Sequence, residues 1–416
     1  MLPSANHDLA RLLSVLHQSE ERILAWQSAL TASRALPPEH GGDGELAKAQ
    51  WLETLLQSLA ITDLKRFDAK DARVSSGLRP NLICRIPGQS PQTLWIFSHL
   101  DVVGPGDLSA WSHDPWSVHR QGDLIFGRGV EDNQQGMVSS LLLAHALMTQ
   151  KITPRLTLGL VFMADEECGN RFGLSHILAS APQLFSEHDY YLVPDFGRPK
   201  AELIEVAEKA TCWLKITTQG EQCHASTPQK GHNAFVAGSA IVLALSQELP
   251  KRFPESNPLF SPPYSTFVPS RHEANVQGIN IVPGRNIFYL DCRILPEIPP
   301  QRVLEAVEEL VQTISQNYGV TSRVTLEHEQ RASAMDATHP HLKVLQEAVK
   351  AVYGLTPRIG GVGGGTVAAL LRQRGLPAMV WACLLDTCHS PDEHASLTAI
   401  QNDSCVFAQI LMQGHD

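Results

Sequence analysis

The sequence lacks the features that would place it in several specialised classes of protein. It has no long basic run and a net charge of −10, so nucleic acid is not expected as its main partner. No apolar run approaches the roughly 18 residues of a membrane span, so a membrane protein is not expected either. The start of the chain has no cationic residues followed by an apolar block, and it predicts a polar-capped helix rather than a signal peptide.

Cysteine is also sparse. The chain has 8 cysteines in 416 residues and no CxxC motif, a usage typical of reduced thiols in a cytoplasmic protein. Histidine, by contrast, occurs 18 times, so a single histidine carries no weight as a functional signal. A chain of this length is too long for one typical hydrophobic core, and two or three domains are expected.

The first half of the chain alternates strands and helices. Residues 93–103, 155–167 and 189–197 are predicted to be buried strands, because each is a short apolar run that ends in polar residues. Residues 136–150 are apolar throughout and predict a buried helix between the first two strands. This order favours an α/β fold with a mostly parallel sheet and helices on both faces, in which ligands bind beyond the carboxyl ends of the strands.

The pattern changes near residue 207. The elements expected from there follow the order β-α-β-β-α-β, which is typical of a ferredoxin-like α+β domain. They are residues 210–220, 233–249, 272–282, 286–295, 299–319 and 322–329. The α/β pattern returns after residue 326, with a buried strand at 378–385. We therefore predict a larger α/β domain formed by residues 1–206 and 327–416, and an inserted domain formed by residues 207–326.

Charged residues gather where the predicted strands end. The strand 155–167 finishes on Glu166 and Glu167, whose like charges repel each other close to an apolar core. Some compensating positive charge is therefore expected. On an extended chain the two side chains face opposite ways, so one can bind a metal ion while the other acts as a general base. A solvent-facing acidic pair is the plainer alternative.

The other candidate residues have similar positions. His99 and Asp101 lie on the same side of an extended chain, as a metal ligand and its orienting carboxylate would, although a strand-end histidine beside a solvated aspartate is the alternative. Asp132 precedes the buried helix, either as its N-cap or as a carboxylate that bridges two metal ions. Asp195 and His389 also follow predicted strands. Two histidines and three carboxylates suit a pair of zinc-like ions, whose charge would relieve the repulsion.

These residues occur in motifs that resemble a known family. SHLDVV, GRGVED, ADEE, PDFG, HASTPQKGHNA, DCRILP, GGGT and CHSPDE appear in the order found in the dinuclear-zinc amidohydrolases and exopeptidases. This family includes carboxypeptidase G, acetylornithine deacetylase, succinyl-diaminopimelate desuccinylase, aminoacylase and the carnosine-type dipeptidases. The resemblance runs from about residue 80 to the end of the chain. It implies a zinc-exopeptidase-like catalytic domain and an inserted lid domain through which the chain forms a homodimer.

The resemblance implies two bound Zn²⁺ ions, for which Co²⁺ or Mn²⁺ are substitutes. His99, Asp132 and Asp195 would hold one ion, and Asp132, Glu167 and His389 would hold the other.

Further roles follow from the same resemblance. Glu166 would be the general base, Asp101 would orient the first histidine, and the Asp132–Asn133 peptide bond would be cis. The chain departs from many members at residues 133–136, where they have DKG, and at residues 367–368 after GGGT. These departures spare the expected ligands but make it unsafe to transfer any one member's substrate.

Substrate-binding residues are expected mainly in the inserted domain. His224 would reach the active site of the partner subunit and donate a hydrogen bond to the oxyanion; a polar loop histidine is the alternative. Arg293 can hold a substrate carboxylate with two parallel hydrogen bonds or form a structural ion pair. The glycine loop lets backbone approach the substrate or is a plain connector. The remaining expected substrate-binding residues are Asn280, Gly364, Gly365 and Thr366.

The implied activity is metal-assisted hydrolysis of an amide bond next to a free carboxylate, in a small N-acyl amino acid or short peptide. Glu166 would take a proton from the zinc-activated water and pass it to the leaving amine, while zinc and His224 stabilise the oxyanion. A deacylase is expected. A dipeptidase or carboxypeptidase would share the same centre, and an inactive metal-binding sensor is a more distant alternative.

Overall fold

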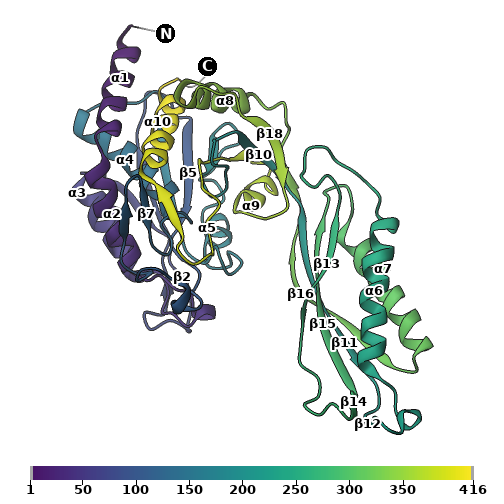
Figure 1. Cartoon of the computed structure of the whole chain (residues 1–416). Coiled ribbons are helices and arrows are strands. Elements are labelled where there is room, and N and C mark those ends of the chain that lie inside the picture. Colours follow the sequence, from purple (N-terminus) through teal and green to yellow (C-terminus); the bar gives the residue numbers. More distant parts are fainter. Residues whose placement is uncertain (1–2, 414–416) are drawn as a thin grey trace. The chain divides into compact units, whose positions relative to one another are not determined.

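The computed structural model describes residues 3–413, which form two compact units (Figure 1). The smaller unit comprises Ala207–Ala334 and Gly360–Gly365, and the larger unit comprises the other described residues. The smaller unit extends beyond the expected boundary at residue 326, because that boundary falls inside a strand. It also takes in the glycine-rich segment, which was expected to belong to the larger domain.

The central sheet has nine strands in the order β1-β4-β8-β5-β9-β19-β10-β17, with β18 paired to β10. Its four middle strands, β8, β5, β9 and β19, run parallel. Antiparallel pairs join β1 to β4, β4 to β8, β19 to β10 and β10 to β17. The prediction of an α/β fold with a mostly parallel central sheet is therefore confirmed. The strands are β1 Asp63–Arg66, β4 Leu82–Ile86, β5 Thr93–His99, β8 Thr157–Met163, β9 Tyr190–Val193, β10 Leu203–Glu208, β17 Ser333–Ala334, β18 Arg358–Val362 and β19 Ala378–Val380.

Helices cover both faces of this sheet (Figure 1). Strand β5 is apolar along its length and buried throughout, so its side chains pack on both faces. Trp95 and Phe97 point to the face that packs against α5 and α9. On the other face α4 contacts β5 and is in turn covered by α10 and α1. The helices of the larger unit are α1 Pro3–His17, α2 Glu20–Ala32, α3 Leu46–Ser58, α4 Gln134–Gln150, α5 Leu174–Ser180, α8 Pro340–Tyr353, α9 Ala368–Arg372 and α10 Leu397–Gln413.

Short elements complete the larger unit. Two small sheets, β2-β3 and β20-β7-β6, lie outside the central sheet. Their strands are β2 Ala69–Lys70, β3 Leu78–Arg79, β6 His119–Gln121, β7 Leu124–Phe126 and β20 His394–Ser396, and the 3₁₀ turns are η1 Pro38–His40 and η2 Leu108–Ala110. None of the helices among the described residues is long and apolar enough to span a lipid bilayer.

The smaller unit is a four-stranded antiparallel sheet of order β13-β15-β11-β16, with α6 and α7 packed on one face. Leu214 and Ile216 of β11 are buried, whereas Trp213, the residue before Leu214, is exposed on the opposite face. The chain order is β-α-β-β-α-β, as expected for a ferredoxin-like domain. The elements are β11 Ala210–Gln219, β12 Cys223–His224, η3 Pro228–Lys230, α6 Ala234–Arg252, β13 Thr266–His272, β14 Ile281–Val282, β15 Arg285–Ile294, α7 Pro300–Asn317 and β16 Thr321–Gln330.

Several strand predictions were wrong in position. The strands expected at 93–103, 189–197 and 378–385 end early, at His99, Val193 and Val380. The strand expected at 272–282 is instead β13, which runs from Thr266 to His272 and contains Pro269. Proline is tolerated there because β13 is the edge strand of its sheet. The strand expected at 155–167 ends at Met163, and Asp165 already has a left-handed φ of 64°. Glu166 and Glu167 therefore lie in a turn and not on an extended strand.

Candidate metal centre

The structure brings together the five side chains that were expected to bind metal. His99 ends β5, Glu167 and Asp195 follow β8 and β9, Asp132 lies in the turn before α4, and His389 lies in the loop after β19. Their donor atoms form two groups, His99–Asp132–Asp195 and Asp132–Glu167–His389. Within each group the donor atoms lie within 4.8 Å of one another. The convergence follows from the sheet, because parallel strands end at the same edge.

Asp132 belongs to both groups through different oxygens. Its Oδ1 lies 2.9 Å from Nε2 of His99, and its Oδ2 lies 3.1 Å from Nε2 of His389. Asp195 Oδ1 is 3.4 Å from Nε2 of His99, and Glu167 Oε1 is 3.0 Å from Nε2 of His389. One carboxylate therefore presents one oxygen to each histidine, an arrangement suited to a ligand shared by two ions.

Asp101 contacts both His99 and the turn that carries the two glutamates. The ring Nδ1 of His99 lies 2.9 Å from the main-chain carbonyl oxygen of Asp101 and 3.5 Å from its Oδ1. The carboxylate itself accepts the backbone N–H of Glu166 and of Glu167, both at 3.0 Å. Although burial by itself would raise it, the pKa of Asp101 is lowered by its contact with His99 and by these two N–H groups. The expected histidine contact is thus made chiefly by the carbonyl, and the carboxylate positions the glutamates.

The charges at the centre perturb one another strongly. Burial and the neighbouring Asp195 carboxylate raise the pKa of Glu166 well above its usual range. Burial and repulsion from Asp132 raise the pKa of Glu167 to about 7. Hydrogen bonds to Asp132 and Glu167 raise the pKa of His389 to about 10. These shifts favour protons on the glutamates and on His389 in the metal-free protein, and divalent cations would replace those protons on binding.

A buried arginine supplies part of the positive charge expected beside the two glutamates. Arg79 is fully buried and forms a salt bridge with Glu45 through Nε and Nη2, with Nε 2.7 Å from Oε2. Its Nη1 lies 3.4 Å from Asp71 and 3.6 Å from Asp165, the residue before Glu166. Arg79 therefore compensates the start of the glutamate turn, and the metal-binding carboxylates remain uncompensated by it.

Sequence reasoning missed several residues that contact the ligands. Asn133 donates from Nδ2 to Oδ1 of Asp195 at 2.6 Å and to the carbonyl oxygen of Pro194 at 2.9 Å. The Asp132–Asn133 peptide bond is cis, as the resemblance implied. Glu131 and Glu393 were missed as well, although each lies inside a motif that carries a ligand. The signal available in the sequence was the closeness of these two acidic residues to the expected ligands Asp132 and His389.

Some of the expected substrate-binding residues lie in the smaller unit. His224 of β12 pairs with Ile281 of β14, and the N–H of Ala225 donates to the carbonyl oxygen of Asn280 at 2.9 Å. The two expected residues therefore share one short ribbon. Nδ1 of the exposed His224 accepts the backbone N–H of Ser226 at 3.1 Å, which leaves Nε2 as the ring atom that carries the proton.

Arg293 is engaged by neighbours from the same unit. Its Nε and Nη2 donate to the two oxygens of Asp291 at 2.8 and 3.0 Å. Its Nη1 donates to the carbonyl oxygen of Gly363 at 3.0 Å and to Oγ1 of Thr211 at 3.1 Å. The arginine thus forms a structural ion pair and holds the glycine loop. Its expected contact with the substrate stays a prediction.

The glycine loop is closely packed at only one of the expected positions. A Cβ at Gly364 would meet no atom within 4 Å, whereas a Cβ at Gly365 would lie 2.4 Å from Nε2 of Gln330. Thr366, in the larger unit, is buried, and its Oγ1 accepts the N–H of Ala368 at 3.1 Å.

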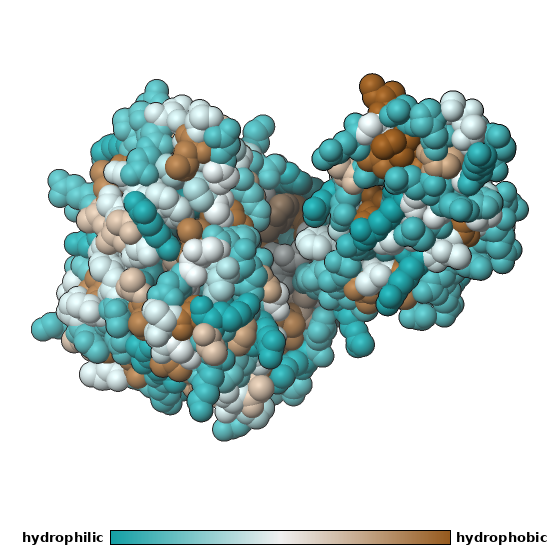
Figure 2. Space-filling view, turned by 90° about the horizontal axis from the view of Figure 1, so that it is seen from below, coloured by the Kyte–Doolittle hydropathy of each residue, from teal (hydrophilic) through white to brown (hydrophobic). Residues whose placement is uncertain are grey.

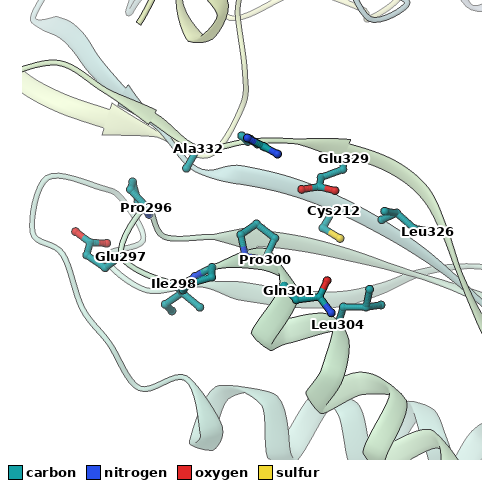
Figure 3. A pocket seen from close by; sticks show the side chains of 12 residues that line it. Cys212, Pro296, Glu297, Ile298, Pro300, Gln301, Leu304, Leu326, Glu329 and Ala332 are labelled. Atoms are coloured by element: carbon teal, nitrogen blue, oxygen red, sulfur yellow. The ribbon is translucent and has the colours of Figure 1, made fainter. Parts of the chain in front are cut away.

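The smaller unit also contains an open cavity of about 510 Å³ (Figure 3). It lies where the start of α7 faces β11 and β16, and its walls include Cys212, Ile298, Pro300, Leu304 and Leu326. None of its lining residues is among the predicted site residues. The cavity is therefore separate from the residues to which the sequence assigned chemistry.

Residues 95–413 match the model of Peptidase family M20/M25/M40. An uncharacterized metallohydrolase of Methanococcus maripaludis is 34% identical over 412 residues, which cover 94% of this chain and 99% of the relative. A succinyl-diaminopimelate desuccinylase of Nitratiruptor sp. is 26% identical over 319 residues, which cover 75% of this chain and 82% of the relative.

Solved structures share the fold at lower sequence identity. Human carnosine dipeptidase 1 superposes with a TM-score of 0.79 at 14% identity, covering 97% of this chain and 98% of that chain. An M20 family metallo-carboxypeptidase from Sulfolobus solfataricus superposes with a TM-score of 0.74 at 19% identity, covering 94% of this chain and 98% of that chain.

Proposed function

The chain belongs to peptidase family M20/M25/M40 and is a metal-dependent hydrolase. We propose that it cleaves an amide bond beside a free carboxylate in a small N-acyl amino acid. The observation that carries the proposal is the position of Asp132, whose two oxygens face His99 and His389 separately. A carboxylate that faces both histidines in this way can serve two metal ions held close together, as in dinuclear hydrolytic centres.

The donor set fits two zinc ions. Histidine nitrogens and carboxylate oxygens are ordinary zinc ligands, and the five donors form two groups joined at one residue. His99, Asp132 and Asp195 would hold one ion, and Glu167 and His389 would hold the other together with Asp132. Such ions, when bound, lower the pKa of a coordinated water and polarise a carbonyl oxygen.

Glu166 is the residue we assign to proton transfer. It lies beside the ligand cluster without belonging to either donor group, and the N–H of its own backbone is fixed by Asp101. Its carboxylate takes a proton from the attacking water and returns it to the nitrogen of the leaving amine.

A second copy of the chain would complete the site. The smaller unit exposes apolar side chains on neighbouring elements: Phe235, Val236 and Leu243 of α6 and Val268 of β13. Figure 2 shows brown, apolar areas on the surface of this unit. The α6 sequence has no charged residue before Glu248, so its outer face suits a protein partner better than solvent. A homodimer through these elements would let Nε2 of His224 of the partner subunit donate to the oxyanion of the reaction.

The choice of an N-acyl amino acid is supported by sequence relatives that are named succinyl-diaminopimelate desuccinylases. A dipeptidase or carboxypeptidase would use the same centre. A substrate panel separates these activities: N-acetyl and N-succinyl amino acids on one side, and dipeptides on the other.

The panel is run on the zinc-loaded chain and on Glu166→Ala. We expect the intact chain to hydrolyse N-acyl amino acids faster than dipeptides, and the variant to bind zinc but lose turnover, because the proton carrier is gone. Faster cleavage of dipeptides would replace the deacylase by a peptidase. Zinc binding with no hydrolysis of either class would favour an inactive metal-binding protein.

A further inference from the structure

Two buried carboxylates outside the ligand set join the loops that carry Asp132 and His389. The first is Glu393, which is fully buried. Its Oε1 accepts the backbone N–H of Glu131 and of Asp132, both at 3.0 Å. Its Oε2 accepts the N–H of Gly129 at 3.0 Å and Nη1 of Arg128 at 2.6 Å. One carboxylate from the His389 loop thus holds the turn that ends in Asp132.

The second is Glu131, which is 1% exposed and precedes Asp132. Its Oε1 accepts the backbone N–H of Leu385 and, at 3.1 Å, that of Asp386. Its Oε2 accepts the N–H of Thr387 at 2.6 Å and the hydroxyl of the same residue at 2.7 Å. This carboxylate therefore holds the start of the loop that leads to His389.

The two contacts are reciprocal. Each glutamate belongs to the loop that the other glutamate binds, and each uses all the acceptor positions of its carboxylate on donors from the opposite loop or its flanks. Between them lies the 3.1 Å contact of Asp132 Oδ2 with His389 Nε2.

We propose that Glu131 and Glu393 form a reciprocal clamp, and that these two positioning residues set the separation of Asp132 from His389. The clamp thereby fixes the donor group of Asp132, Glu167 and His389, and so the binding of the second metal ion. The inference rests on the proposed dinuclear site.

The local backbone explains why such a clamp is needed. Asp386 and His389 both have left-handed backbone conformations, with φ of 68° and 63°. Non-glycine residues seldom adopt this region, so the loop is not held by a regular ladder of hydrogen bonds. Its N–H groups at residues 385–387 point instead to one carboxylate. Arg128, itself buried beneath the ring of Trp111, neutralises Glu393 and donates from Nη2 to the carbonyl oxygen of Ser390.

Replacing either glutamate by glutamine tests the clamp with little change of volume. Glutamine keeps one acceptor oxygen and puts an NH₂ group where the other oxygen stood. Some of the N–H and O–H groups that now donate to the glutamate would therefore face another donor and lose their hydrogen bond. The full-length metal-free chain and the variants Glu131→Gln and Glu393→Gln are titrated with Zn²⁺ and, for its absorption spectrum, with Co²⁺. Backbone hydrogen exchange of the metal-free proteins is measured in parallel.

We expect the second ion to bind at least about tenfold more weakly in both variants, the usual effect of losing a group that supports a metal ligand. The first ion should be weakened less, because it keeps His99 and Asp195, which the clamp does not contact. The Co²⁺ spectrum should lose the contribution of the second ion. The rate of backbone hydrogen exchange should rise at residues 129–132 in Glu393→Gln and at residues 385–387 in Glu131→Gln. Thr387→Val removes one donor of the clamp, and we expect a smaller effect of the same kind from it.

The control is Asp403→Asn, another fully buried carboxylate, whose hydrogen bonds go to Gln135, Tyr353 and the N–H of Cys383. We expect it to leave the affinity for both ions unchanged. Wild-type affinity for the second ion in both glutamine variants, or an equal loss in Asp403→Asn, would overturn the clamp. An unaltered chain that binds two ions but hydrolyses no amide would instead overturn only the proposed function, and one that binds fewer than two ions would overturn both.

Discussion

Asp101→Asn should weaken metal binding through two separate contacts. Each oxygen of Asp101 accepts one backbone N–H at 3.0 Å, from Glu166 and Glu167. Asparagine keeps one acceptor, so one buried N–H loses its partner, at a cost of about 1–3 kcal/mol in the free energy of unfolding. The ring of His99 also loses the carboxylate 3.5 Å from its Nδ1. Because the main-chain carbonyl of residue 101 still accepts from Nδ1, we expect zinc affinity to fall by about tenfold, the lower end of the usual effect of losing a supporting contact.

Two measurements separate these effects. Urea unfolding of the metal-free protein gives the stability, and competition with a chelator gives the zinc affinity. Asp189→Asn is the matched control, because Asp189 is also buried and its carboxylate accepts the N–H of Thr93 at 2.8 Å and Nε1 of Trp95 at 3.0 Å, at the other end of β5. It should lose similar stability and keep its zinc affinity. Asp101→Asn with wild-type zinc affinity would refute the positioning role of this carboxylate.

Two further predictions concern the smaller unit. Leu243→Lys places a charge on the exposed face of α6, and it should shift sedimentation toward the monomer and lower activity. Leu108→Lys, at an equally exposed leucine of the larger unit, should change neither. An intact, active dimer in Leu243→Lys would exclude this face as the dimer interface. Arg293→Lys loses the paired contacts with Asp291 and should raise KM about tenfold or more with little change in kcat if the residue binds the substrate carboxylate. An unchanged KM would leave Arg293 only its ion pair and its bond to Gly363.

The ligand cluster could be predicted because it depends on one general property of parallel sheets. His99, Glu167 and Asp195 follow neighbouring strands, and strand ends at the same edge lie close together. The sequence did not need to specify any pairwise distance. The same argument predicted the fold class, since the buried strands are recognisable from their continuous apolar runs.

The supporting contacts could not be predicted in this way. Glu131 and Glu393 bind each other's loops across more than 250 residues, and no local pattern indicates which N–H groups a buried carboxylate accepts. Arg79 reaches Glu45 and Asp165 for the same reason. The Arg293–Asp291 pair was a different case, because residues two apart on a strand share a face, and this partner was visible in the sequence.

The identity of the edge strand was also hidden. Proline is found in strands mainly at the edge of a sheet, and only the complete sheet shows that β13, which contains Pro269, lies at such an edge. Likewise, the end of β8 at Met163 depends on Asp101, whose carboxylate binds the N–H groups of the glutamate turn.

The most direct test of the account is the number of zinc ions bound by the intact chain and by Asp132→Ala. The two oxygens of Asp132 face His99 and His389 separately, so this residue should serve both ions. We predict two ions per intact chain and a marked loss of affinity for both ions in the variant. Two tightly bound ions in Asp132→Ala, or a single ion in the intact chain, would contradict the shared ligand on which the proposed chemistry depends.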